Sequence, residues 1–218
     1  MHERRKQLLP RADLRAIYDI IPPGSKMLDL GCGDGVLLQL LRQEKNVLGC
    51  GVEISQDKIL NCVNAGVPVV QGDLDKGLRE FPDDSFNYVV LSQTLQAVRR
   101  PDRLLGEMAR VGQNIVVSLI NFGHISSRFQ LMLKGRMPVT DSLPTPWYET
   151  LNIHLGTIND FRDLCREKNL DVAREIPVAT SFVSLATMWP NMFAPTCIFL
   201  LKKTSRYPEK NESESGCH

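Results

Sequence analysis

The stretch MLDLGCGDG, residues 27–35, decides the fold. A short apolar run leads into glycines at alternate positions, and an apolar pattern with helical spacing begins at Val36. Glycines let a backbone turn tightly and approach a ligand that any Cβ would keep away. In open parallel sheets, ligands bind at the carboxyl ends of strands, where such turns lie. The stretch therefore predicts a buried strand, a ligand-binding turn and a helix.

The same alternation continues along the chain. Strands are expected at Met27–Leu30, Val47–Ile54, Val67–Gln71, Phe86–Leu91, Asn114–Leu119, Leu170–Val178 and Thr196–Leu201. Helices are expected at Arg11–Ile21, Val36–Arg42, Gln56–Ala65, Asp102–Val111 and Thr157–Asn169, the last opened by a capping box of Thr157 and Asp160. Strands and helices in this order predict an α/β fold with a mostly parallel sheet and helices on both faces.

Length and charge limit the organisation and the partners. The 218 residues suit one domain, expected at residues 1–203, followed by a polar tail at 204–218 that we expect to be disordered. With 26 basic and 25 acidic residues, the net charge of +1 gives no field for a nucleic acid or an anionic membrane. No run approaches the roughly 18 apolar residues of a membrane span, so we expect a cytoplasmic protein.

Neither the six cysteines nor the four histidines predict a metal site. The cysteines form no Cys-x-x-Cys pair, and the histidines have no spacing typical of metal ligands. We expect reduced, mostly buried thiols and no bound metal.

The glycine turn does not suit a dinucleotide. In the fingerprint G-x-G-x-x-G/A, the third glycine would fall on Val36 or on Leu38, depending on where the motif starts. Asp29 lies directly before the turn, where a carboxylate attracts an ammonium group and repels a phosphate. A pyrophosphate ligand is therefore disfavoured.

Three acids end three successive predicted strands. Asp29 can attract an amino-acid ammonium group, Glu53 can accept hydrogen bonds from ribose hydroxyls, and Asp73 can accept from an adenine amino group. An acid at a strand end is on its own more often a helix cap or a solvated side chain. Together, in this order, the three acids predict a site for S-adenosylmethionine or its product S-adenosylhomocysteine.

The chain resembles the class I S-adenosylmethionine-dependent methyltransferases from about Leu14 to Leu119. The segments that carry the resemblance are LDLGCGDG (28–35), GVEIS (51–55), QGDLDKGL (71–78) and FPDDSFNYVVLSQTLQAV (81–98). The resemblance implies a Rossmann-like, seven-stranded sheet whose last strand is antiparallel. It also implies that Leu74 contacts the adenine through its backbone and that Ser92 and Gln93 lie beside the methionine moiety. The candidate cofactor-binding residues are Asp29, Gly31, Cys32, Gly33, Gly35, Glu53, Ile54, Asp73, Leu74, Ser92 and Gln93.

An insertion of about thirty-five residues, at about 121–156, follows the fifth predicted strand, where roughly 2 to 6 residues are usual. We expect a short helix around Phe129–Leu133 and an extended, proline-stiffened path after it. Because the insertion leaves the carboxyl end of a strand, we expect it to cover the cofactor, with Trp147 and Tyr148 facing whatever binds there. The alternative is that these two rings only anchor the loop to the domain.

The residues that would perform catalysis are not identified by the sequence. The loop after the fourth strand reads Ser92-Gln93-Thr94-Leu95, without the polar-Pro-Pro-aromatic motif of amino-nitrogen acceptors. Gln96 cannot take a proton at neutral pH, and no general base is visible there. If a base exists, Tyr148 and His154 are the best candidates, and with Asn152 they would hold a small-molecule acceptor.

A narrower resemblance covers nearly the whole chain except the tail. NFGH (121–124), the run from Leu133 to Cys165 and LSQTLQAVRRPDRLLGEMARVG (91–112) are similar to the bacterial MetW family of methionine biosynthesis proteins. That resemblance implies a partner of homoserine O-acyltransferase, with no methyl acceptor established. The alternative is an active methyltransferase acting on an unidentified small molecule.

A second segment is a candidate partner surface. The connection between the last two predicted strands, residues 182–193, is rich in methionine and aromatic residues. An exposed apolar surface of this kind often marks a protein interface. The alternative is a buried connection that covers the edge of the sheet.

Overall fold

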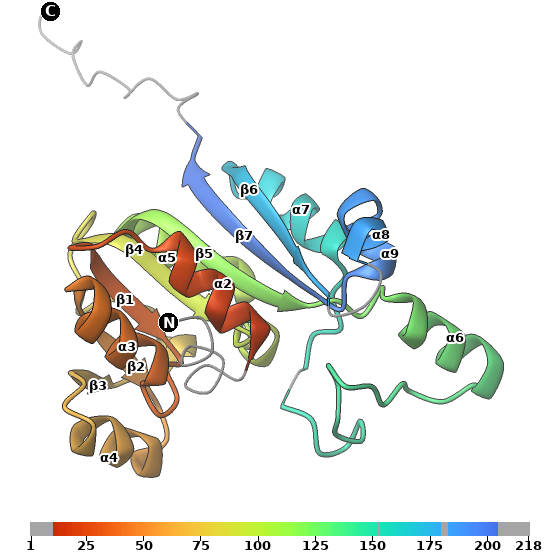
Figure 1. Ribbon diagram of the computed structural model, residues 1–218, viewed down its shortest axis with the longest axis horizontal. Coiled ribbons are helices and arrows are strands. Elements are labelled where there is room, and N and C mark those ends of the chain that lie inside the picture. Colours follow the sequence, from red (N-terminus) through yellow and green to blue (C-terminus); the bar gives the residue numbers. More distant parts are fainter. Residues whose placement is uncertain (1–10, 152, 180–182, 205–218) are drawn as a thin grey trace, which may run out of the picture.

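The structure, a computed structural model, describes residues 11–151, 153–179 and 183–204. Seven strands form one sheet in the order β3-β2-β1-β4-β5-β7-β6. The first five strands pair in parallel, and β7 runs antiparallel to both β5 and β6 (Figure 1). The strands are β1 (Lys26–Leu30), β2 (Leu48–Glu53), β3 (Val69–Gln71), β4 (Phe86–Ser92), β5 (Gly112–Ile120), β6 (Leu170–Val178) and β7 (Thr196–Lys203). The predicted mostly parallel sheet with an antiparallel last strand is confirmed.

Helices cover both faces of the sheet, as predicted. They are α2 (Ala12–Ile20), α3 (Val36–Lys45), α4 (Gln56–Asn64), α5 (Pro101–Val111), α6 (Ile125–Lys134), α7 (Ile158–Glu167), α8 (Val183–Met188) and α9 (Pro190–Phe193), with 3₁₀ turns η1 (Leu74–Lys76) and η2 (Leu95–Ala97). Successive side chains of a strand point to opposite faces. Val89 and Leu91 therefore pack into the core under α5 and α7, whereas Val90 packs into the core under α2 and α3.

Several boundaries differ from those expected. The predicted strand Val67–Gln71 is only three residues long and mostly exposed, because β3 is an edge strand paired with β2 alone. Helix α3 runs to Lys45, a turn beyond the predicted end at Arg42. The last connection contains α8 and α9, which the sequence pattern did not predict. Residues 205–218 of the predicted tail, Asn152 and Phe182 lie outside the described residues.

The capping box that opens the helix after the insertion is confirmed. The Thr157 hydroxyl accepts a hydrogen bond from the Asp160 backbone N–H at 3.2 Å. The Asp160 carboxylate in turn accepts from the Thr157 backbone N–H at 2.9 Å. Two N–H groups that a helix start leaves without partners are thereby satisfied.

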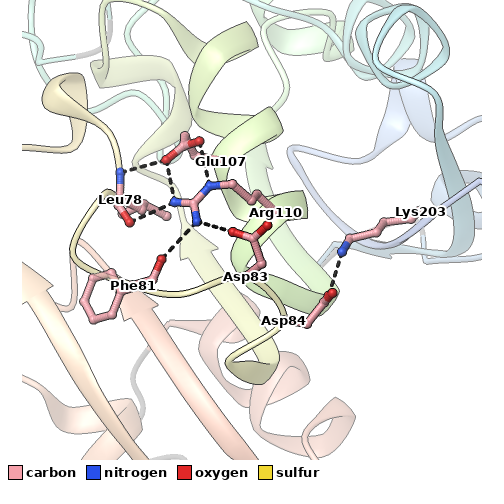
Figure 2. A network of polar contacts seen from close by, with 7 residues as sticks. All are labelled: Leu78, Phe81, Asp83, Asp84, Glu107, Arg110 and Lys203. Atoms are coloured by element: carbon pink, nitrogen blue, oxygen red, sulfur yellow. Dashed lines mark hydrogen bonds and ion pairs between the residues drawn. The ribbon is translucent and has the colours of Figure 1, made fainter. Parts of the chain in front are cut away.

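Arg110 of α5 holds the loop that joins η1 to β4 (Figure 2). Its guanidinium donates to both carboxylate oxygens of Glu107, at 3.0 and 2.8 Å, and to Asp83 at 2.6 Å. It also donates to the carbonyl oxygens of Leu78 and Phe81, both at 3.0 Å. These five bonds match the five N–H donors of an arginine. The loop after η1 is therefore fixed against the body of the domain.

The insertion extends beyond the sheet on the side of α8 and α9 (Figure 1). Asn121, buried at the end of β5, donates through Nδ2 to the carbonyl oxygens of Ala194 at 2.8 Å and Asn191 at 3.1 Å. Its Oδ1 accepts from the Gly123 N–H at 2.9 Å. The start of the insertion is thus tied to α9, while α6 points away from the domain.

Candidate functional site

A cavity of about 920 Å³ lies at the carboxyl ends of the parallel strands, where the sequence predicted it. Residues at the ends of β1, β2, β3 and β4 line it, as do residues of α2 and of the insertion. Ten of the eleven candidate cofactor residues are in the lining: Asp29, Gly31, Cys32, Gly33, Glu53, Ile54, Asp73, Leu74, Ser92 and Gln93. Gly35 is not in the lining, although its neighbours Asp34 and Val36 are. The sheet topology therefore gathers side chains that are up to 64 positions apart, from Asp29 to Gln93, around one space.

Asp29 is the next-to-last residue of β1 and lines the cavity. Its side chain is buried, and burial raises the pKa of its carboxyl to about 7. The Arg11 guanidinium opposes this rise in the pKa, and the Glu53 carboxylate adds to it. A positively charged ligand group would favour the ionised form of Asp29.

Glu53 ends β2 and is oriented by three backbone donors. One carboxylate oxygen accepts from the Gly33 N–H at 2.9 Å. The other accepts from the N–H groups of Ile54 at 2.9 Å and Ser55 at 3.0 Å. A carboxylate offers about four lone-pair sites, so acceptor capacity for a ligand hydroxyl remains. The bond to Gly33 also couples the acid of the second strand to the glycine turn of the first.

The glycine turn has two kinds of position. Gly33 has a φ of +59°, and a Cβ on it would meet no atom within 4 Å. Gly35 has a φ of +73°, and a Cβ on it would lie 2.9 Å from Cys62 Sγ. Gly33 thus leaves ligand space open, whereas Gly35 permits the helix α3 to pack against α4.

Cys32 of the same turn lines the cavity but is a poor nucleophile. Burial raises the pKa of its thiol far above the usual range, and the neighbouring Asp29 carboxylate raises it further. The reactive form of a cysteine is the thiolate. The geometry therefore gives Cys32 a packing role.

Asp73 and Leu74 also line the cavity. The Asp73 carboxylate accepts from the Asp75 N–H at 3.0 Å and caps η1. Its other oxygen has no such bond among the described residues and is available to a ligand. The sequence placed this acid at the end of the third strand, and the structure places it in the cavity lining, two residues beyond the end of β3 at Gln71.

A polar network at the floor of the cavity was not predicted. The Ser92 hydroxyl donates to Asp13 of α2 at 3.0 Å and accepts from Arg11 at 2.6 Å. The buried Ser118 hydroxyl also donates to Asp13, at 2.7 Å. Burial alone would raise the pKa of Asp13, but the hydrogen bonds and charge of Arg11 and the two hydroxyls hold it below its usual value. Arg11 reaches the cavity from outside the motifs, so no spacing in the sequence could have identified it.

Among the described residues of the insertion, three line the cavity, and Trp147 and Tyr148 are not among them. Thr145, Glu149 and Leu151 line the cavity. Tyr148 is 67% exposed and Trp147 71% exposed, and neither is in the lining. The expectation that both rings face the cavity is therefore not met, and the ionisable side chain that the insertion brings there is Glu149.

His154 also lies outside the lining, and its backbone has a structural role. Its N–H and that of Ile153 donate to the Gln96 carbonyl oxygen, at 3.1 and 2.9 Å. The buried Gln96 side chain donates to the His154 carbonyl at 3.1 Å and accepts from the Ile120 N–H at 3.0 Å. Gln96 thus fastens the insertion to the end of β5, directly after the cavity residues of β4.

The described residues contain no group of three or more histidine, cysteine or acidic side chains that could hold a metal ion. Among the same residues, no helix is both long and apolar enough to cross a bilayer.

Comparison with known proteins gives the family. The sequence pattern of the methionine biosynthesis protein MetW matches residues 11–201. The chain belongs to the MetW family. A bifunctional methionine biosynthesis protein, MetXA/MetW, from Rhodopirellula baltica is 38% identical to this MetW family member over 173 residues, which is 75% of this chain. The chain spans only 28% of the length of that relative.

Solved structures share the fold of this MetW family member. An S-adenosylmethionine-dependent methyltransferase from Archaeoglobus fulgidus matches with a TM-score of 0.66 at 17% identity, covering 91% of this chain and 97% of its own. A phosphoethanolamine N-methyltransferase from Haemonchus contortus, in complex with S-adenosyl-L-methionine, matches with a TM-score of 0.63 at 14% identity, covering 91% of this chain and 52% of its own. The chain therefore has the class I methyltransferase fold.

Proposed function

We propose that this MetW family member binds S-adenosylmethionine or S-adenosylhomocysteine in the cavity and acts in cytoplasmic methionine biosynthesis as a partner of homoserine O-acyltransferase. The observation that carries the cofactor part is the position of Asp29, Glu53 and Asp73 around one cavity, in chain order. Each carboxylate suits one portion of the ligand: the ammonium group, the ribose and the adenine.

Arg11 extends this match to a fourth portion of the ligand. Its guanidinium reaches the cavity and hydrogen-bonds Ser92. Its Nε and Nη2 donate to the two carboxylate oxygens of Asp13, at 3.1 and 2.5 Å. Its Nη1 makes no hydrogen bond among the described residues, and its two N–H groups can donate to a ligand carboxylate. We assign the methionine carboxylate to Arg11 and the methionine ammonium group to Asp29.

The fused relative supports the acyltransferase part. Its name joins a MetXA unit to a MetW unit in one chain, and we take the MetXA unit to be a homoserine O-acyltransferase. Two units that act together benefit from covalent linkage, because linkage raises their effective concentration. The proposed partnership therefore consists of contact between a MetW unit and an acyltransferase unit.

The test of this function is an acyltransferase assay. Purified homoserine O-acyltransferase from the same organism is measured alone, with this protein, and with this protein plus S-adenosylmethionine. We expect higher acyltransferase activity when the protein is present. Unchanged activity in all mixtures, with both proteins folded, would refute the partnership.

The second candidate function is methyl transfer to a small molecule. It is favoured by Glu149, a carboxylate from the insertion that lines the cavity and can act as a general base. If methyl transfer occurs, a cell extract with labelled S-adenosylmethionine should yield labelled product, and Glu149→Gln should reduce its rate by about 10²-fold or more. Absence of S-adenosylhomocysteine formation with every extract would leave only the partner function.

A further inference from the structure

Helix α6 carries apolar side chains but buries almost none of them. Phe129, Leu131, Met132 and Leu133 are all exposed, the last two at 70% and 73%. Within α6, every residue of which is described, Ser127 alone is buried. The helix is held at its start, where the His124 ring nitrogen accepts from the Ser126 N–H at 3.3 Å and Arg128 donates to the Gly123 carbonyl at 2.5 Å.

A helix with so little buried apolar surface has no evident source of stability within the domain. Isolated helices shorter than about 12 to 15 residues are marginal in water, and most helices in proteins are stabilised by packing an apolar face. Helix α6 has ten residues; of its apolar side chains Ile125 is partly buried, and Phe129, Leu131, Met132 and Leu133 are exposed. The packing partner of its exposed apolar side chains therefore lies outside the part of the chain that the structure describes.

The segment after α6 also exposes apolar and aromatic side chains. Trp147 and Tyr148 pack edge to face, with ring centroids 5.8 Å apart, and both are exposed. Leu151 and Ile153 are exposed beside them in the chain. Because Leu151 lines the cavity, we give the name insertion face to the other seven side chains: Phe129, Leu131, Met132, Leu133, Trp147, Tyr148 and Ile153.

We infer that the insertion face is the docking surface for the homoserine O-acyltransferase, an inference that rests on the proposed function. Methionine, tryptophan and tyrosine are enriched in protein interfaces, and buried aromatic side chains dominate their binding energy. The partner must present an apolar groove with acidic residues at its rim. The rim charge follows from Ile125–Met137, which contains Arg128, Lys134 and Arg136 and no acid.

The same charges disfavour a second copy of this chain as the occupant. In a two-fold symmetric dimer, each surface patch meets its own copy. Arg128, Lys134 and Arg136 would then face the same three cations, and like charges across an interface are unfavourable. A different protein with carboxylates at matching positions relieves that repulsion.

The test compares two exposed apolar pairs on opposite edges of the molecule. The first variant carries Met132→Asp and Leu133→Asp on α6. The control carries Leu60→Asp and Val63→Asp on α4, where the side chains are 59% and 60% exposed. Figure 1 places α4 at the far edge of the sheet from α6. A third variant, Trp147→Ala, probes the insertion face without adding charge.

Binding to the purified acyltransferase is measured by calorimetry, and self-association by sedimentation. We expect the dissociation constant to rise by about 30-fold or more for the α6 variant and for Trp147→Ala, as for interface hot spots. The α4 control should bind like the wild type, and S-adenosylmethionine affinity should be unchanged in all three variants, which also reports that they fold.

Each other outcome overturns the inference in a distinct way. If the wild type and all variants bind the acyltransferase equally well, the docking surface is elsewhere and the proposed function stands. If the wild type does not bind the acyltransferase, the proposed function fails with the inference. If the wild type is a dimer that the α6 variant dissociates, the insertion face joins two copies of this chain.

Discussion

The carboxyl group of Asp29 makes the stability of the free protein depend on pH. Its pKa of about 7 lies above the 3.8 of an unburied aspartate. Between these values the folded form holds a proton that the unfolded chain releases, so stability falls as pH rises from about 4 to about 7. Asp29→Asn should abolish this fall and raise the free energy of unfolding at about pH 8, by at most about 4 kcal/mol.

Chemical unfolding of both proteins at about pH 5 and about pH 8 measures this effect. The advantage of Asp29→Asn should widen toward the higher pH. An advantage of the same size at both pH values would show that the buried carboxyl is not the cause.

The same carboxyl should make cofactor binding depend on pH in the opposite direction. The ammonium group of the ligand requires the ionised form of Asp29, so a bound proton must be released below about pH 7. Affinity for S-adenosylmethionine should therefore rise about tenfold from pH 6 to pH 8. In Asp29→Asn, affinity should be weaker throughout and lose this dependence, as calorimetry at several pH values can determine.

Gly33 and Gly35 have different roles in the glycine turn: Gly33 borders the space for the ligand, whereas Gly35 borders packed side chains. Gly33→Ala places a methyl group in open space and costs about 1–2 kcal/mol for the left-handed backbone, but it should obstruct the cofactor. Gly35→Ala adds a contact of 2.9 Å with Cys62 Sγ and should destabilise the fold more. Thermal unfolding and cofactor titration of both variants test this, and unimpaired binding by Gly33→Ala would remove the glycine turn from the site.

The sequence predicted those site residues whose position follows from the order of the strands in the sheet. Asp29, Glu53 and Asp73 lie within two residues of the carboxyl ends of parallel strands, so the topology alone brings them together. Arg11 contributes through a side chain from the start of α2, whose direction depends on how the helix packs against β4 and β5. No spacing within one chain encodes that direction.

The insertion marks the limit of prediction for whole elements. The existence of the insertion and of its helix follows from the length and the apolar pattern of the sequence. The sequence does not show which side chains of its irregular segment face the cavity and which face solvent. Tyr148 and Glu149 are neighbours, yet only Glu149 lines the cavity. An extended loop has no repeat that assigns one side to the core, whereas the alternation within β4 assigned Val89 and Val90 to opposite faces.

Gln96 connects the insertion to the sheet through hydrogen bonds to His154 and Ile120. Gln96→Ala would leave the buried Ile120 N–H and the His154 carbonyl without their side-chain partner. We expect a loss of about 1–3 kcal/mol in stability and faster amide exchange at 145–155. Gln113→Ala, which removes one exposed contact with Asn87 at 3.2 Å, is the matched control. Equal exchange rates in both variants would contradict the role of Gln96.

At the scale of the whole molecule, one segment separates the cofactor cavity from the insertion face. Thr145, Glu149 and Leu151 line the cavity, while Trp147 and Tyr148 between them face outward. A partner that orders this segment should therefore change cofactor affinity, and the cofactor must change partner affinity by the same factor. Coupled sites of this kind typically show about 5- to 150-fold effects.

Calorimetric titration of the acyltransferase with and without saturating S-adenosylmethionine measures that factor. Gln96→Ala, which loosens the segment, should bring the factor by which the cofactor changes partner affinity closer to one. If partner affinity is identical with and without the cofactor in the wild type, the two sites are independent.

The central claim is that one cavity binds an adenosyl ligand through acids from three strands, and calorimetry on the purified wild-type protein tests it most directly. S-adenosylmethionine and S-adenosylhomocysteine should each bind at a single site. Of the alanine variants of Asp29, Glu53 and Asp73, Asp29→Ala should weaken S-adenosylmethionine binding most, because only this variant removes the partner of the ammonium group. Folded protein that gives no binding heat with either compound, at about pH 8 where Asp29 is ionised, would contradict the claim.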